Sequence, residues 1–112
     1  ILTEQFFGEL EGWNKEELAK KIGEDKLNFY RRSVGSNPPK GEAFSSVKKR
    51  AIEVLLLLNQ YENEFDHIIV IGHNNILRAI ALEYGHCSPC DFSTFELYNC
   101  QPMVLKKQLW NQ

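Results

Sequence analysis

The sequence predicts an α/β fold in which a mostly parallel sheet is sandwiched between helices, incomplete in this chain. Residues 68–71 form an apolar run of β-branched side chains without polar alternation, a pattern typical of a strand buried on both faces of a parallel sheet. This run lies between two segments with helical periodicity, and that alternation is typical of layered α/β proteins. The 112 residues, 43% hydrophobic and 25% charged, fit one small globular domain.

The first third of the chain predicts a loop, two short helices and a second loop. These segments are residues 1–13, 15–22, 25–32 and 34–41. The Asn14 side chain can cap the first helix, because it can accept a hydrogen bond from a free N–H of the first turn. Gly23 is expected to end that helix in the left-handed conformation. Pro38 and Pro39 mark the second loop.

The rest of the chain predicts alternating helices and strands. Apolar residues recur at helical spacing from Phe44 to Leu58, the clearest amphipathic helix of the sequence. The segments that follow are a strand at 68–71, a helix at 75–84 ended by Gly85, a short helix at 88–95 and a strand at 103–109. Lys106 and Lys107 favour an edge position for the last strand.

Composition excludes several classes of function. A net charge of −2 and a pI near 5.9 give no general attraction to nucleic acid or anionic membranes. The longest apolar run, 54–58, is far shorter than the roughly 20 residues that span a bilayer. Three cysteines, an odd number, favour a reducing and hence cytoplasmic location. Cys87 and Cys90 lack a second ligand pair, so we expect no metal site.

His73 is placed where α/β proteins bind ligands. It follows the predicted strand directly, and ligands of open α/β sheets bind at the carboxyl ends of strands. Asn74 and Asn75 then begin a helix whose free N–H groups and dipole attract an anion. The alternative is an ordinary histidine at a strand end. His67 and His86 are expected to be surface histidines.

Glu4 is a candidate proton donor. It lies in a loop beside Phe6 and Phe7, and a partly shielded carboxyl group can serve as a general acid. Gly8 and Gly12 would let the backbone pass close to a ligand. The alternative is one acidic residue among 15 in a solvated loop.

Arg31, Arg32 and Lys15 are candidate anion binders. Arginine suits bidentate contacts with phosphate or carboxylate. The alternative for the arginine pair is a solvated helix end favoured by the dipole. Lys15 opposes the dipole at the start of its helix, which hints at a nearby anion.

Together these motifs resemble the histidine phosphatase superfamily, in its phosphoglycerate-mutase-like branch. Residues 2–15 resemble the family pattern L-N-E-R-x-Y-G-x-L-x-G-x-N-K, and 71–78 resemble A-A-H-G-N-S-L-R. Three further stretches match in order: 31–33 with the prolines that follow, 41–43 and 99–104. The resemblance spans nearly the whole chain and implies a mostly parallel sheet between helices.

The resemblance also implies roles. Glu4 matches the general acid, and His73 matches the second active-site histidine, which contacts the transferring phosphoryl group. Substrate-binding positions of the mutases match Lys15, Arg31, Arg32 and Asn75, and we include Asn74 beside them. Phe7 stands where mutases carry a substrate-contacting tyrosine. The small phosphorylated substrate would be bound without nucleic acid or membrane, and a homo-oligomer is compatible with the sequence.

Three departures from the family pattern matter. The nucleophilic histidine belongs to an R-H-G motif that we expect upstream of Ile1, so residues 1–112 are interpreted as the C-terminal portion of one domain, inactive by itself. Asn74 replaces a glycine. The segment between Pro39 and Gly41 is short, whereas cofactor-dependent mutases carry an insertion there, and this favours a phosphatase. Lys15, Arg31 and Arg32 instead favour a mutase.

The resemblance therefore predicts a glycolytic phosphoglycerate mutase or a phosphomonoester phosphatase that acts through a phosphohistidine. A phosphatase would need no cofactor, and a mutase would use 2,3-bisphosphoglycerate. The alternative is a pseudoenzyme of the same fold that binds a phosphorylated ligand without turnover. An R-H-G tripeptide upstream of Ile1 would favour the enzyme.

Overall fold

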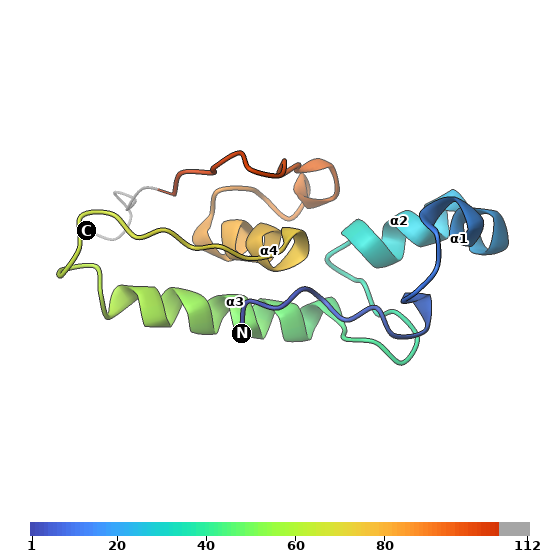
Figure 1. The fold of residues 1–112 in the computed structure, drawn as a ribbon, viewed down its shortest axis with the longest axis horizontal. Helices are drawn as coiled ribbons and strands as arrows, with labels where there is room; N and C mark the ends of the chain where they lie inside the picture. Colours follow the sequence, from blue (N-terminus) through green and yellow to red (C-terminus); the bar gives the residue numbers. More distant parts are fainter. Residues whose placement is uncertain (106–112) are drawn as a thin grey trace.

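The computed structural model describes residues 1–105. Within them the chain forms four α-helices and two short 3-10 helices. In chain order these are η1 (Gly8–Leu10), α1 (Lys15–Ile22), α2 (Glu24–Arg32), α3 (Phe44–Asn59), α4 (Asn74–Tyr84) and η2 (Phe92–Thr94) (Figure 1). The four longer helices confirm the sequence prediction, with each end within about one residue of its expected place.

The two glycines predicted as helix ends behave differently. Gly85 ends α4 in the left-handed conformation, with φ 86° and ψ 11°, as predicted. Gly23 also has a positive φ of 89°, but its ψ of 150° is extended, so the predicted left-handed cap is wrong. The reason is its position, since Gly23 ends α1 and directly precedes the first residue of α2. The predicted cap at Asn14 is confirmed by a 2.8 Å hydrogen bond that its side chain accepts from the Glu16 N–H.

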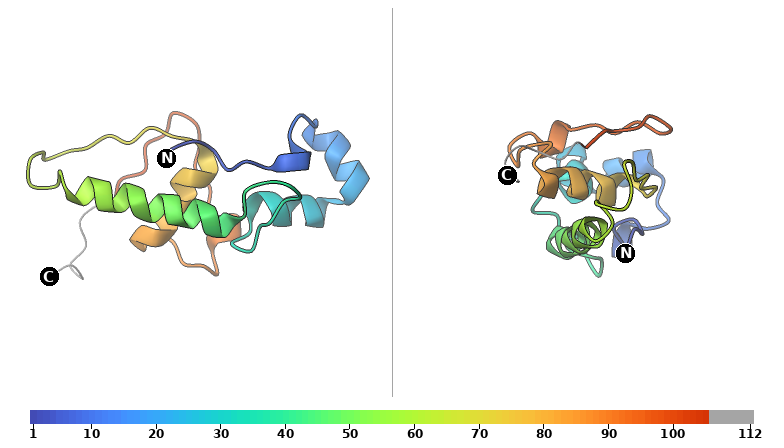
Figure 2. Two further views of the ribbon diagram at one scale, coloured as in Figure 1. Left: turned by 90° about the horizontal axis from the view of Figure 1, so that it is seen from below. Right: turned by 90° about the vertical axis from the view of Figure 1, so that its left-hand side faces the viewer.

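The core lies between α3 and α4, which cross one another (Figure 2). Their buried faces follow the apolar spacing of the sequence, and η2 adds an aromatic ring. Phe44 and Phe92 pack with ring centroids 4.9 Å apart and planes tilted by 57°. The buried core residues are Phe44, Val47, Ala51, Val54, Ile76, Ala79, Ile80 and Phe92.

The molecule is elongated, measuring 49 × 25 × 24 Å along its principal axes. α1 and α2 pack on one another at one end, and α3 and α4 form the other (Figure 1). The C-terminal end of α2 lies close to the N-terminal end of α4, where the Arg31 carbonyl accepts a hydrogen bond from the Asn75 side chain. No helix of the described part has the length and hydropathy needed to cross a membrane.

The predicted sheet is not formed among residues 1–105. Residues 68–71 have no helical or strand assignment, and no backbone hydrogen bond joins them to another described residue. Ile69 and Ile71 are 86% and 82% exposed, so the predicted burial on both faces is wrong for this structure. The physical reason is that a strand requires a neighbour to pair its N–H and C=O groups, and no described segment takes that place.

The two C-terminal predictions are corrected in part. The short helix predicted at 88–95 is reduced to a turn and the 3-10 helix η2, whose Phe92 is buried in the core. Residues 103–105 of the last predicted strand form no strand, and its remaining residues 106–109 lie outside the described part.

Candidate active site

The Glu4 carboxylate lies at the N-terminal end of α4. Its two oxygens accept hydrogen bonds from the Asn75 N–H at 3.0 and 3.2 Å, and one of them also accepts from the Gln5 N–H at 2.9 Å. The first N–H groups of a helix have no partner within it, and the helix dipole favours a negative charge there. Residues about 70 positions apart in the sequence are thereby brought together.

His73 precedes α4 in the N-cap position. Its backbone is extended, with φ −111° and ψ 165°, and its carbonyl accepts the Leu77 N–H of the first turn at 3.0 Å. The residue is exposed, and its side chain makes no capping hydrogen bond. His73 therefore stands at the same helix end as Glu4, with its imidazole available to a ligand.

Asn74 and Asn75 have different environments. The exposed Asn74 donates from Nδ2 to the Leu97 carbonyl at 3.1 Å, which ties the start of α4 to the segment after η2. Asn75 is buried, and its side-chain amide is hydrogen-bonded to three residues, namely Gln5, Arg31 and Arg78. The part of Asn75 that faces the candidate proton donor is its backbone N–H.

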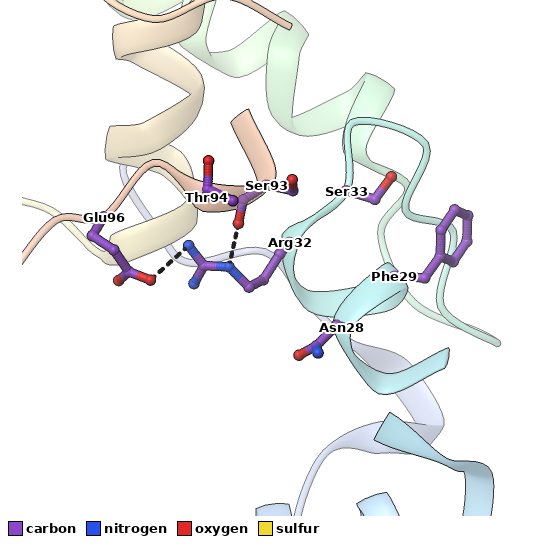
Figure 3. A pocket seen from close by; sticks show the side chains of 7 residues that line it. All are labelled: Asn28, Phe29, Arg32, Ser33, Ser93, Thr94 and Glu96. Carbon is purple, nitrogen blue, oxygen red and sulfur yellow. Dashed lines mark hydrogen bonds and ion pairs between the residues drawn. The ribbon is translucent and has the colours of Figure 1, made fainter. Parts of the chain in front are cut away.

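Arg32 is engaged by neighbouring protein groups. Its Nε donates to the Ser93 carbonyl at 2.6 Å and its Nη2 to the Phe95 carbonyl at 3.0 Å. The same nitrogen lies 3.1 Å from a carboxylate oxygen of Glu96 (Figure 3). Such a partly exposed ion pair contributes only about 0–1 kcal/mol, so an anionic ligand could compete with Glu96.

An open pocket of about 480 Å³ lies beside Arg32. Its lining contains neither Glu4 nor His73, so we do not place the reacting group there. The lining residues are Asn28, Phe29, Arg32, Ser33, Ser93, Thr94 and Glu96 (Figure 3).

Arg31 and Lys15 occupy different places. The exposed Arg31 is the next-to-last residue of α2, and its side chain makes no hydrogen bond or ion pair to a described residue. The Arg31 carbonyl accepts a hydrogen bond from the Asn75 side chain. Lys15 begins α1, at the end of the molecule away from α4 (Figure 1). The structure thus brings Arg31 to the end of α4 that carries His73 and leaves Lys15 on the outlying helix.

The loop that carries Glu4 is fixed by a partly buried ion pair between Arg50 and Glu42. Arg50 of α3 donates to both carboxylate oxygens of Glu42, at 2.9 and 2.7 Å, and to the Ile1 and Thr3 carbonyls at 2.8 and 2.7 Å. Burial by itself raises the pKa of the Glu42 carboxyl, but the hydrogen bonds from Arg50 and the Phe6 N–H outweigh it and lower that pKa below its ordinary value. Glu42 therefore stays ionised and ties the loop to α3.

Two glycines allow this loop to cross another closely. The Glu9 N–H donates to the Pro39 carbonyl at 2.9 Å and the Glu42 N–H to the Phe6 carbonyl at 2.6 Å. A Cβ on Gly8 would lie 2.2 Å from the Pro39 carbonyl oxygen, and one on Gly41 would lie 2.7 Å from the Phe6 carbonyl oxygen. The approach of the backbone to a ligand at Gly8 and Gly12 stays a prediction. In the structure Gly8 approaches the 39–41 turn of the protein, and a Cβ on Gly12 would meet nothing within 4 Å.

Sequence reasoning missed Arg78, which is fully buried. Its guanidinium donates to the Phe95 and Phe92 carbonyls and to Asn75 Oδ1, and it lies 4.2 Å from the Phe92 ring centroid. Burial, followed by the charge of Arg32, lowers the pKa of Arg78 to about 10, so it remains charged near neutral pH. Arg78 lies three residues after Asn75 on the helix predicted at 75–84, and residues at that spacing share a helix face, which is the signal that could have indicated it.

No group of three or more histidine, cysteine, aspartate and glutamate side chains within the described residues could hold a metal ion. Cys87, Cys90 and Cys100 are free thiols.

Comparison with known proteins identifies the class of protein. The sequence model of the histidine phosphatase superfamily (branch 1) matches residues 1–108, and the chain belongs to that superfamily. Membership implies an α/β fold, of which the described residues show the helices.

Similar curated proteins narrow this class. The chain is 34% identical over 108 residues to 2,3-bisphosphoglycerate-dependent phosphoglycerate mutase 2 of Gloeobacter violaceus, covering 96% of this chain and 49% of the relative. It is 31% identical to the 2,3-bisphosphoglycerate-dependent phosphoglycerate mutases of Gloeothece citriformis and Chlamydia pneumoniae, covering 92% of this chain and 45% and 46% of those relatives. The chain thus spans about half the length of these curated relatives. No solved structure gives a significant match.

Proposed function

We propose that the chain contributes the proton donor and a phosphoryl-contacting histidine to an enzyme that transfers phosphoryl groups through a phosphohistidine. The observation that carries the proposal is the Glu4 carboxylate bound to the Asn75 N–H, at the helix end that begins with His73. Membership in the histidine phosphatase superfamily supports phosphoryl transfer.

The proposed reaction has two steps. A histidine from a segment outside these 112 residues attacks phosphorus, the bond between phosphorus and the leaving oxygen breaks, and Glu4 gives that oxygen a proton. In the second step the oxygen of water, in a phosphatase, or of a phosphoglycerate hydroxyl, in a mutase, attacks phosphorus and the bond between phosphorus and the histidine nitrogen breaks. Glu4, whose carboxylate form accepts the Asn75 N–H after the first step, takes the proton of that water or hydroxyl and is ready to donate again. In both steps His73 donates a hydrogen bond to a phosphoryl oxygen as charge develops.

The cationic side chains serve substrate binding in this proposal. Arg31 is exposed beside the start of α4 and fits the carboxylate of a phosphoglycerate or the second phosphate of a bisphosphoglycerate. Arg32 would join it by exchanging its Glu96 partner for the ligand. Asn74 lies beside them, and Lys15 would have to approach from the outlying helix α1.

The choice between mutase and phosphatase sets the cofactor. The names of the relatives point to a mutase that depends on 2,3-bisphosphoglycerate, which when bound supplies the phosphoryl group of the phosphohistidine. Arg31 would hold one of its anionic groups. The tight turn at 38–41, closed by a 3.0 Å hydrogen bond from the Gly41 N–H to the Pro38 carbonyl, instead favours an open site and a phosphatase. A cytoplasmic location forms part of the proposal.

The test is product analysis with the full-length protein. With 3-phosphoglycerate and 2,3-bisphosphoglycerate present, we expect inorganic phosphate release at least comparable to 2-phosphoglycerate formation. Isomerisation with negligible phosphate release would instead assign a mutase. Binding of phosphorylated ligands without either product would support the pseudoenzyme.

A further inference from the structure

We propose that Gln5 is a positioning residue that holds the Glu4 carboxylate against the start of α4, an inference that rests on the proposed function. Gln5 is only 2% exposed, although it lies in a loop next to the candidate proton donor. A buried amide must find partners for its N–H and C=O groups, because leaving one unpaired costs free energy. Gln5 finds them on three separate segments.

The partners of Gln5 use both ends of its amide. Its Nε2 donates to the Glu42 carbonyl at 2.9 Å and to Ser36 Oγ at 3.3 Å. Its Oε1 accepts from Asn75 Nδ2 at 3.1 Å. One side chain therefore joins the Glu4 loop to the turn before α3, to the loop after α2 and to the first turn of α4.

The direction of these hydrogen bonds is set by groups that can only donate or only accept. Arg78 can only donate, so the Asn75 oxygen must face it, as the 3.1 Å contact from Nη1 to Oδ1 shows. The Asn75 NH₂ group then faces the Arg31 carbonyl and Gln5, which must present its own oxygen. The Gln5 NH₂ group is left facing the Glu42 carbonyl, which can only accept.

This series of hydrogen bonds also involves the Glu4 carboxylate. The backbone N–H groups of Gln5 and Asn75 both donate to the Glu4 carboxylate, at 2.9 and 3.0 Å. The side chains of the same two residues bind one another. The Glu4 carboxylate is thus held by two residues, Gln5 and Asn75, whose side chains are hydrogen-bonded to one another. Removal of the Gln5 side-chain amide frees the loop that carries Glu4, while the Asn75 N–H keeps its place on α4.

The test uses the full-length protein and two substrates that differ in their need for a proton donor. The leaving oxygen of an alkyl phosphate such as 3-phosphoglycerate must be protonated, whereas p-nitrophenolate leaves readily without a proton. The compared quantity is kcat/KM, which reports the step that forms the phosphohistidine and releases the leaving group. We expect Gln5→Met to lower kcat/KM on 3-phosphoglycerate by about 10-fold, a fraction of the effect of a general acid, and to change kcat/KM on p-nitrophenyl phosphate by less than about 2-fold. A purely structural role would lower both rates equally.

Three variants calibrate the result. Glu4→Gln should show the same dependence on the leaving group with a larger amplitude, of about 10²–10⁴-fold. Val54→Ala, in the core of α3 and only 3% exposed, should affect both substrates alike. If Gln5→Met fails to fold, Gln5→Asn keeps an amide with a donor for the Glu42 carbonyl and an acceptor for Asn75 on a side chain one methylene shorter, and it should show the same dependence at about 3-fold.

The outcomes separate the two proposals. Wild-type protein without turnover of either substrate would reject the proposed function and this inference with it. If instead the wild-type protein is active and Glu4→Gln shows the leaving-group effect, the proposed function is kept. The inference is then rejected if the Gln5 variants lose both activities equally or lose neither.

Discussion

At the scale of single residues, His73 carries the strongest prediction for activity. Preorganised hydrogen-bond donors to a developing anion are worth roughly 3–4 kcal/mol. His73→Ala in the full-length protein should therefore lower turnover by about 10²–10³-fold. The matched control is His67→Ala, at an exposed histidine in the same segment between α3 and α4, which should leave turnover unchanged. Wild-type turnover in His73→Ala would remove this residue from the site.

Glu42 predicts how the Glu4 loop responds to acid. Its pKa is lowered in the folded protein, so its ionised form stabilises the fold at pH values above its ordinary pKa, and that contribution is lost as the pH falls through the lowered value. Glu42→Gln should reduce the free energy of unfolding by about 1–2 kcal/mol at pH 7 and have less effect near pH 3. Urea titrations at the two pH values measure this difference. An effect that grows toward acid would contradict the assigned sign.

Site residues could be predicted from the sequence where a motif contains them. They could not be predicted where their role depends on buried contacts with distant residues. Glu4 and His73 stand out in the sequence, and the structure brings them to one helix end. Gln5 gives no local signal, because its role depends on Asn75, 70 positions away. For Arg78 the helix position could be predicted, but its carbonyl partners on the segment after α4 could not.

At the scale of elements, the crossing of the 6–9 and 39–42 segments predicts a difference between two glycines. Gly8 and Gly12 both have positive φ, 60° and 82°, so alanine is strained at either position. A Cβ at Gly12 meets nothing within 4 Å, whereas one at Gly8 lies 2.2 Å from the Pro39 carbonyl oxygen. Gly12→Ala should cost about 1–2 kcal/mol of unfolding free energy. Gly8→Ala should cost clearly more in the same denaturant titration and lower turnover, and equal costs would contradict the crossing.

The helices could be predicted because their signals are local. The apolar spacing of α3, the Asn14 cap and Gly85 each act within a few residues of one helix. The run at 68–71 has the composition of a buried strand, but pairing depends on a neighbour elsewhere in the protein. That dependence explains why its strand prediction is not realised among the described residues.

At the scale of the whole molecule, the exposed isoleucines predict how residues 1–112 behave when prepared alone. Ile69 and Ile71 are more than four-fifths exposed beside backbone groups that pair with no described residue. Such an edge promotes association between chains. We expect this polypeptide to be inactive and either unstable or associated, as measured by analytical ultracentrifugation and thermal unfolding. A monodisperse monomer that unfolds cooperatively would be the opposite result.

A longer polypeptide that also contains the part of the curated relatives outside this match should reverse that behaviour. The chain covers about half of each curated relative discussed above, 49% in the Gloeobacter violaceus mutase. The full-length protein should be monodisperse and should protect the backbone amides of 68–71 from hydrogen exchange. Unprotected amides in that segment would show that it is not a strand of the sheet.

A phosphohistidine, formed with the help of Glu4 and His73, is the intermediate on which the proposed function depends. The most direct measurement is to mix the full-length protein with ³²P-labelled phosphoglycerate, quench within milliseconds to seconds, and follow the label on the protein. We expect a protein-bound label that is lost in acid and stable in base and that forms at least as fast as product appears. The label should form more slowly in His73→Ala. Product formation without such a label, or ligand binding with neither label nor product, would contradict it.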